Sequence, residues 1–220
     1  MSQQTYFILG TDTDCGKTYV TCQLVAFAKK NYTTLAIKPI ASGCPLVQNQ
    51  PVSGDVAELK KANQCDDSIG GWQFVRPISP HLAAKDHGVE LSIDSIAQFC
   101  QPFTRYERLF IEGAGGLMVP LNESDTWIDF LKRTQWPVIL VVGMRLGCIN
   151  HALLTASTLA ANTIHLSGWI ANRIDPHMLA YEDNIRTLMR HIPAPMLAEV
   201  GFSQPIQPTR ALHALLQGND

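Results

Sequence analysis

Short apolar runs recur along the chain, and turn-forming residues bound each of them. These runs are Tyr6–Leu9, Leu35–Ile37, Leu109–Ile111, Val138–Val142, Gly168–Ala171 and Leu197–Val200. Most are continuous rather than alternating, which is typical of strands buried on both faces of a sheet. We therefore expect six strands in a sheet that is covered on both sides.

Segments with helical spacing of their apolar residues separate these runs. They are Lys17–Lys30, Asp55–Ala62, Ile93–Phe99, Trp127–Lys132, Asn150–Asn162 and Tyr181–Arg190. The alternation of strand and helix predicts parallel βαβ units. The predicted fold class is therefore α/β, a single domain over residues 1–220 with a mostly parallel sheet and helices on both faces.

The connection between the second and third strands, residues 39–107, is unusually long. Connections in compact domains have a median of about 4–6 residues. Long segments that leave the carboxyl ends of strands are where α/β proteins place substrate contacts. We expect 39–107 to be an insertion that carries substrate-side loops.

Composition narrows the class of protein. Of the 220 residues 46% are hydrophobic and the formal net charge is −2. A real core is therefore expected, and bulk affinity for nucleic acid or for an anionic membrane is disfavoured. The longest apolar run, Val138–Val142, is far too short to span a bilayer, and the first residues carry no secretory pattern. We expect a cytoplasmic protein with reduced cysteines.

A glycine-rich segment, Gly10–Thr18, follows the first strand and opens a helix. Backbone N–H groups in this context bind phosphate oxygens. Lys17 would then reach the β- and γ-phosphates, and the Thr18 hydroxyl would ligate Mg²⁺. Gly10 lies one residue earlier than the strict pattern G-x-x-x-x-G-K-[ST] requires, and a chance G-K-T is the alternative. The context favours nucleotide binding and a P-loop NTPase-like fold.

Two carboxylates are candidate metal ligands. Glu112 ends an apolar run and precedes a glycine turn, so it can hold Mg²⁺ at the same sheet edge, or it can be an ordinary solvated acid. Asp55 begins a predicted helix, and its alternative role is a first-turn acid that interacts with the helix dipole. Spacing alone leaves both alternatives open.

Two further positions follow predicted strands. Lys38 would point into the same cleft and stabilise phosphoryl charge, unless it is an ordinary exposed strand-end lysine. Asn172-Arg173-Ile174-Asp175 comes close to the N-[KT]-x-D signature by which many GTPases read guanine. Base contact by Asn172 and a plain polar turn both remain possible there.

Several segments together resemble the dethiobiotin synthases, the ATP-dependent ring-closing enzymes of biotin biosynthesis. The most specific is Val141–His151, which reads VVGMRLGCINH. The matching segments cover nearly the whole chain in the expected order and comprise Gly10–Thr18, Lys38–Gly43, Ser79–His81, Glu112–Gly116, Leu140–His151 and Ile192–Pro195.

The resemblance implies roles for individual residues. It implies Thr18, Asp55 and Glu112 as magnesium ligands and Lys17 and Lys38 as catalytic residues. The implied substrate-binding residues are Thr13, Ser42, Leu146, Gly147, Cys148, Ile149 and Asn150. The implied nucleotide-binding residues are Asp14, Cys15, Gly16, Lys17, Thr18, Tyr19, Asp55, Glu112, Gly113, Ala114, Gly115, Asn172, Arg173, Gly201, Phe202 and Ser203.

The resemblance also implies a homodimer, in which Leu146–Asn150 of one subunit reaches the carboxylate end of substrate bound mainly to the other. Three positions depart from the family's pattern. Cys15 stands where valine is common, Arg173 replaces the usual acid, and Gly201-Phe202 replaces a proline-led segment in the adenine pocket. These departures concern the details of base binding.

The implied reaction converts diaminopelargonate, CO₂ and ATP into dethiobiotin, ADP and phosphate. A carbamate would attack the γ-phosphorus, and the second amine of the resulting carbamic–phosphoric anhydride would close the ring. Two rival functions use a similar loop. A partitioning-type ATPase switch usually has a second lysine early in the phosphate loop, whereas Gly10-Thr11-Asp12 has none. The second alternative, a GTPase, is suggested only by the segment Asn172–Asp175.

The phosphate loop also carries a cysteine. N–H donors, a helix N-terminus and a neighbouring lysine lower the pKa of a thiol. Because Cys15 lies in such a loop beside Lys17, we expect it to be the most reactive of the six thiols and to be protected by ATP.

Overall fold

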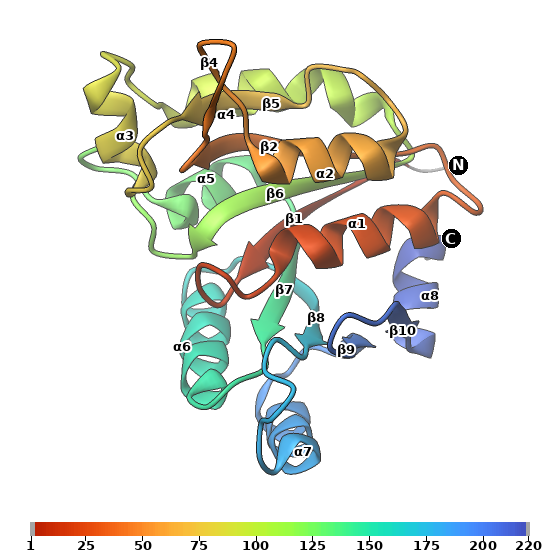
Figure 1. The fold of residues 1–220 in the computed structure, drawn as a ribbon. Helices are drawn as coiled ribbons and strands as arrows, with labels where there is room; N and C mark the ends of the chain where they lie inside the picture. The colour runs from red at the N-terminus through yellow and green to blue at the C-terminus, as the bar shows by residue number, and fades with distance from the viewer. Residues whose placement is uncertain (1–2, 219–220) are drawn as a thin grey trace.

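An eight-stranded sheet runs through the molecule in a computed structural model that describes residues 3–218 (Figure 1). Its order is β10-β9-β8-β7-β1-β6-β2-β5, and every neighbouring pair is parallel except β10 and β9. The strands are β1 Gln4–Gly10, β2 Thr34–Ser42, β5 Gly70–Phe74, β6 Arg108–Gly116, β7 Val138–Gly143, β8 Leu166–Asn172, β9 Met196–Val200 and β10 Ile206–Pro208.

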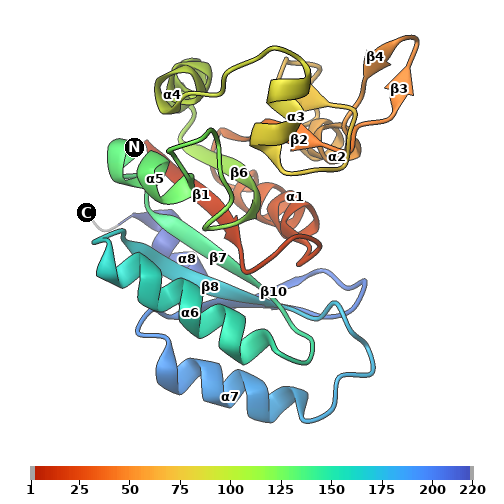
Figure 2. The ribbon, with the colours of Figure 1, turned by 90° about the vertical axis from the view of Figure 1, so that its left-hand side faces the viewer.

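Helices cover both faces of the sheet (Figures 1 and 2). One face carries α1 Lys17–Ala28, α2 Gly54–Asn63 and α8 Arg210–Gln217. The other face carries α4 Ile93–Cys100, α5 Trp127–Thr134, α6 Cys148–Ala161 and α7 Tyr181–His191. The remaining elements are the hairpin β3 Leu46–Val47 and β4 Gln50–Pro51, α3 Pro80–Asp86 and the 3₁₀ helix η1 Gln101–Arg105. The predicted α/β fold class is confirmed.

The apolar runs of the sequence form the centre of the core. Phe7 in β1 and Val138–Val142 in β7 are fully buried. The Phe7 ring packs against Trp127 and Phe130 of α5, with ring centroids 5.1 and 5.8 Å apart. Burying one large apolar side chain contributes about 1.5–3 kcal/mol. The parallel strands therefore hold their carboxyl ends at one rigid edge.

The six predicted strands and six predicted helices are all present, but two strands run further than expected. The pattern ended them at Ile37 and Ile111, whereas β2 continues to Ser42 and β6 to Gly116. The prediction that Lys38 and Glu112 follow their strands is therefore wrong, since both lie within strands. The physical reason for the longer β2 is the partner strand β5, which pairs with residues 38–42.

The sequence pattern missed β5, the hairpin β3–β4, α3, β10 and α8. Strand β5 reads GGWQF and α3 spans seven residues, so neither carries a periodic apolar signal of useful length. Within the described part of the chain, none of the helices has both the length and the apolar character needed to cross a membrane.

Candidate functional site

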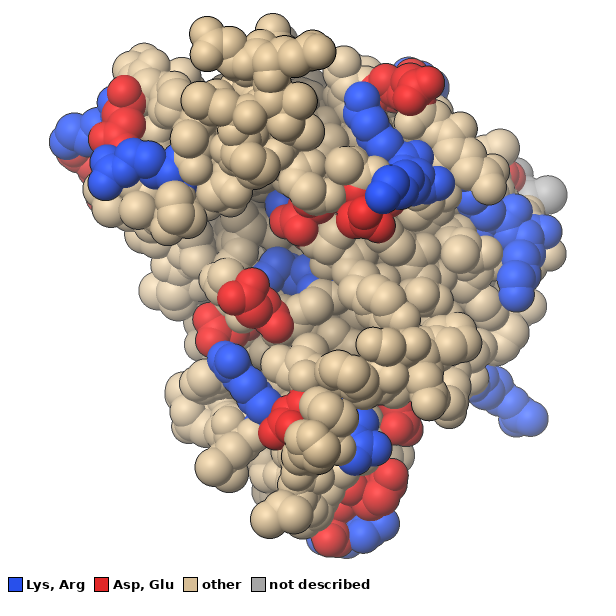
Figure 3. All heavy atoms as spheres, viewed as in Figure 1, with Lys and Arg blue, Asp and Glu red and all other residues tan. Residues whose placement is uncertain are grey.

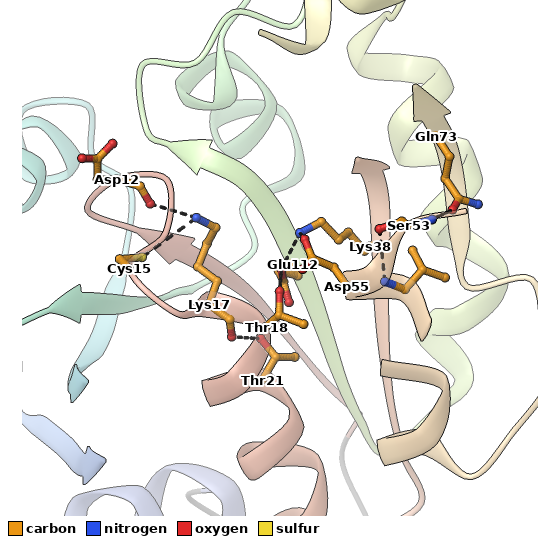
Figure 4. A network of polar contacts seen from close by, with 11 residues as sticks. Asp12, Cys15, Lys17, Thr18, Thr21, Lys38, Ser53, Asp55, Gln73 and Glu112 are labelled. Carbon is orange, nitrogen blue, oxygen red and sulfur yellow. Dashed lines mark hydrogen bonds and ion pairs between the residues drawn. The ribbon is translucent and has the colours of Figure 1, made fainter. Parts of the chain in front are cut away.

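The phosphate loop connects the end of β1 to the start of α1 and wraps around the side chain of Lys17. The Lys17 ammonium donates to the Asp12 carbonyl at 2.9 Å (Figure 4). The Thr11 N–H donates to the carbonyl of Val141 at 3.0 Å. Gly16 precedes the helix with φ +82°, a left-handed conformation that glycine adopts without strain. The loop is thereby tied to both β1 and β7.

Four polar side chains from four elements meet beside this loop (Figure 4). The Lys38 ammonium of β2 donates to Glu112 Oε1 of β6 at 2.6 Å and pairs with the carboxylate of Asp55 in α2. The Thr18 hydroxyl of α1 donates to the same Glu112 oxygen at 2.6 Å. Lys38 is 5% exposed, Glu112 is fully buried and Asp55 is 48% exposed. The topology therefore assembles one compact cluster of opposite charges.

The two charged partners hold each other in the ionised form. Burial by itself raises the pKa of Asp55, but the charge and the hydrogen bond of Lys38 outweigh burial and bring this pKa below its ordinary value. Burial lowers the pKa of Lys38, but Glu112 and Asp55 outweigh that effect and raise it above its ordinary value. A carboxylate therefore faces an ammonium at neutral pH.

The donor set of this cluster fits Mg²⁺. Glu112 Oε2 is buried and has no hydrogen-bond partner among the described residues. Hard oxygen ligands from one or two carboxylates, completed by water and phosphate oxygens, are what Mg²⁺ prefers. Residues 3–218 contain no group of three or more His, Cys, Asp or Glu side chains suited to a metal. The side chains that could hold a magnesium ion here are the Asp55 and Glu112 carboxylates and the Thr18 hydroxyl.

A cleft of about 750 Å³ opens above the cluster and the phosphate loop. Figure 3 shows charged side chains of both signs around the hollow on this face. Thr13, Lys17 and Thr18 line it on the loop side, and Lys38, Ser42 and Glu112 line it on the strand side. Residues 77–80, which lead from β5 into α3, close another side. The cleft therefore joins a phosphate-binding loop to a polar wall from the 39–107 region.

Comparison with known proteins identifies the family. The chain is 50% identical to the ATP-dependent dethiobiotin synthetase of Legionella pneumophila strain Paris over 204 residues, 91% of this chain and 95% of the relative. It is 40% identical to the enzyme of the same name from Alteromonas mediterranea over 96% of this chain and 98% of the relative. The chain belongs to the ATP-dependent dethiobiotin synthetase family. The predicted enzyme class, an ATP-dependent ligase, is confirmed with it.

Wider comparisons agree on the fold. A family described as an AAA domain matches residues 4–210. The crystal structure of FtsY from Thermotoga maritima covers 98% of this chain and 69% of its own, with TM-score 0.55 and 14% identity. A structure of FlhF complexed with GMPPNP and Mg²⁺ covers 99% and 74%, with TM-score 0.56 and 14% identity. At this identity the likeness concerns the fold alone, and it confirms the P-loop NTPase-like architecture.

The residues predicted for the nucleobase end gather apart from the cleft. Asn172, at the end of β8, is buried and donates its amide to the Cys15 carbonyl at 2.9 Å. The Arg173 guanidinium lies 4.6 Å from the centre of the Tyr181 ring and donates to the carbonyl of Pro176. The Tyr19 hydroxyl donates to the carbonyl of Gln204, which brings residues 201–203 beside α1. Half of Phe202 is exposed on this side.

The predicted substrate segment from Leu146 to Asn150 does not line the described cleft. Leu146 is 96% exposed, while Cys148 is buried at the start of α6. Sequence reasoning missed the neighbouring contact between Arg145 and Asp12, whose side chains pair at 2.7 Å. The only sequence feature that could have suggested this ion pair is the charge of Arg145, which directly precedes the predicted substrate segment.

The structure contradicts a reactive Cys15. This residue is 2% exposed, and a Cβ atom on Gly10 would come within 2.5 Å of its sulfur, so the thiol is packed inside the loop. Cys22 is partly exposed, but burial raises its pKa to about 12. Native alkylation followed by mass mapping should therefore label the partly exposed Cys65 before either of them. Labelling of Cys15 ahead of Cys65 would show that the loop opens in solution.

Proposed function

We propose that this chain makes dethiobiotin from diaminopelargonate, CO₂ and ATP, releasing ADP and phosphate. The observation that carries the proposal is one cleft in which the phosphate loop faces Lys38, Ser42 and Glu112, in a chain of this family. The reaction must bring an anionic nucleophile next to a triphosphate. The main requirement is therefore positive charge beside both the nucleophile and the triphosphate. The protein supplies two cations for this purpose, the ammonium groups of Lys17 and Lys38.

The nucleotide side uses the phosphate loop. Its N–H groups and Lys17 would bind the phosphates, with Asp14–Tyr19, Gly113–Gly115 and the 201–203 segment around the nucleotide. Thr18, Asp55 and Glu112 would hold magnesium, which neutralises phosphate charge when it is bound. Adenine as the base is part of the proposal, with Asn172 and Arg173 beside it, and competition between ATP and GTP for the site tests it.

On the substrate side, one amine of diaminopelargonate first adds to CO₂ and forms a carbamate. A carbamate oxygen attacks the γ-phosphorus, the bond to ADP breaks, and a carbamic–phosphoric anhydride results. The second amine then attacks the carbonyl carbon, closes the five-membered urea ring and expels phosphate. Lys38 would stabilise the carbamate and the transferring group, and Thr13 and Ser42 would orient the diamine. None of these steps needs a covalent enzyme nucleophile.

We also propose that the enzyme is a cytoplasmic homodimer. Met118 and Leu154 are 65% and 60% exposed and line a groove of about 500 Å³ between α6 and residues 116–120, and Leu146, just before α6, is 96% exposed. Exposed apolar side chains gathered in this way are typical of a protein interface. In the dimer, Leu146–Asn150 would reach the carboxylate end of the partner's substrate. Sedimentation at micromolar concentration tests the assembly.

Oxygen labelling tests the reaction sequence. Because the attacking carbamate oxygen comes from CO₂, the phosphate released from ATP in the presence of [¹⁸O]bicarbonate should carry one labelled oxygen. Mass spectrometry of the phosphate in the first turnovers measures it. Dethiobiotin formed together with unlabelled phosphate would contradict the carbamate route, and absence of dethiobiotin would contradict the function itself.

Glu112→Gln should weaken Mg-ATP turnover and keep the native fold, with a lower melting temperature because one partner of the buried ion pair with Lys38 is lost. An amide is a poorer ligand for a hard cation than a carboxylate, so raising magnesium should restore part of the activity. Turnover measured against magnesium concentration checks this expectation. A loss that does not depend on magnesium would exclude Glu112 as a metal ligand.

A further inference from the structure

Two carboxylates hold the ammonium of Lys38 at one edge of the cleft. Glu112 Oε1 accepts its hydrogen bond at 2.6 Å, and the Asp55 carboxylate pairs with it from the other side. Glu112 is fully buried and Lys38 is 5% exposed, so water screens these charges little. A buried carboxylate without a cation is costly. Lys38 is therefore the charge that allows two carboxylates to lie side by side here.

The carboxylates that hold Lys38 are the ones proposed to hold the metal. Glu112 Oε1 accepts from both Lys38 and the Thr18 hydroxyl, and Asp55 completes the group. A cation ligated by these three residues would lie beside the ammonium, because even the unpartnered Oε2 of Glu112 belongs to the carboxylate that Lys38 contacts. Two cations this close in a buried site repel each other strongly. The ammonium and a divalent ion therefore exclude each other.

We propose that Lys38 is the counter-ion of Asp55 and Glu112 in the nucleotide-free protein, and that it has to leave both carboxylates before they can ligate a divalent cation. The inference rests on the proposed function only in that a metal–nucleotide complex is the co-substrate. The backbone N–H of Lys38 donates to the Ile69 carbonyl at 2.9 Å within the sheet. The exchange is therefore a movement of the side chain alone.

The exchange makes metal binding depend on the nucleotide. When Lys38 leaves the carboxylates it needs another anion, and the phosphates in the same cleft provide one. A divalent ion without nucleotide therefore binds weakly, because it would leave the ammonium buried without a partner. The same movement brings the ammonium toward the group that is transferred. Lys38 thus neutralises the carboxylates in the nucleotide-free site and contacts the phosphates in the nucleotide-bound site.

Manganese binding to the nucleotide-free protein tests the proposal, with free Mn²⁺ counted by electron paramagnetic resonance. Lys38→Met should bind Mn²⁺ at least about tenfold more tightly than the unmodified chain. Lys17→Met is the matched control, because it removes the same charge from the cleft, but its ammonium bonds the Asp12 carbonyl rather than a carboxylate. It should change the affinity much less. Equal affinities for Lys38→Met and the unmodified chain would overturn the proposal.

A second measurement keeps the test decisive if Lys38→Met does not fold. In protein labelled with ¹³C at lysine Cε, the Lys38 signal can be assigned by its loss in Lys38→Arg. Mg²⁺ alone should leave this signal in place, and the same Mg²⁺ concentration with adenylyl imidodiphosphate should move it. A signal that moves with Mg²⁺ alone would overturn the exchange. Neither measurement contains diamine or bicarbonate, so its outcome is separate from that of the turnover test.

Discussion

Lys38→Gln should release phosphate at least about a hundredfold more slowly than the unmodified chain and still bind Mg-ATP within a few-fold of normal. In the ground state Lys38 is proposed to exchange the carboxylates for the phosphates, so its loss changes Mg-ATP binding little, whereas the charge of the transferring group exists fully only while that group is in flight. An interaction made mainly in the transition state affects kcat more than ground-state binding. Loss of one preorganised charge donor commonly costs about 10²–10³-fold in rate.

The environment of Lys38 adds a stability effect to this prediction. Removing one partner of a buried ion pair commonly costs about 3–5 kcal/mol, because the remaining charge is left uncompensated. Lys38→Gln should therefore melt at a lower temperature without ligand and recover part of the loss with Mg-ATP. Lys38→Arg should restore little activity, since a planar guanidinium does not replace a compact ammonium in a confined site.

The control for Lys38→Gln is Lys17→Gln. Lys17 belongs to the phosphate loop, so its loss should weaken ATP binding and turnover together. Calorimetry with Mg-ATP and a phosphate-release assay separate the two patterns. Near-normal turnover of Lys38→Gln would show that Lys38 has no role in phosphoryl transfer and acts only as a counter-ion.

Gly16→Ala should lower ATP affinity at least about a hundredfold, the second large effect. Gly16 has φ +82°, where an L-residue other than glycine commonly costs about 1–2 kcal/mol. A Cβ atom here would also come within 2.1 Å of Asn172 Nδ2, the atom that holds the Cys15 carbonyl. The loop would have to shift away from β8, and the N–H groups that it presents to phosphate would shift with it.

Gly54→Ala is the matched control for this substitution. Gly54 begins α2 in an ordinary helical conformation, and no described atom lies within 4 Å of the added Cβ position. Its replacement should leave ATP affinity unchanged, which calorimetry with Mg-ATP measures. Normal ATP binding by Gly16→Ala would mean that the loop conformation is not what binds the nucleotide.

Much of the fold could be predicted because the buried strands leave a strong signal. Val138–Val142 is continuously apolar, and β7 is continuously buried. Strand β5 left no such signal, because it lies at the edge of the sheet and its sequence, GGWQF, contains two glycines and a glutamine in place of a continuous apolar run. The end of β2 depends on its pairing with β5. Because β5 was not predicted, Lys38 and Ser42 were assigned to the connection after the strand instead of to β2 itself.

The cluster could be anticipated only in part. A strand–loop–helix signature placed Lys17 and Thr18, since backbone geometry there is local. The pairing of Lys38 with Asp55 and Glu112 is a long-range contact between β2, α2 and β6, which no local pattern encodes. The prediction of a reactive Cys15 was wrong for the same reason. Gly143 of β7 packs against Cys15, and only the fold brings these two distant residues together.

Phosphate release from Mg-ATP, measured with and without diaminopelargonate and bicarbonate, shows whether this cleft catalyses dethiobiotin synthesis. We expect slow release with ATP alone or with either addition alone. Release should be rapid when both are present, with one dethiobiotin formed for each phosphate. Release that ignores both additions would contradict the assignment of this cleft to dethiobiotin synthesis.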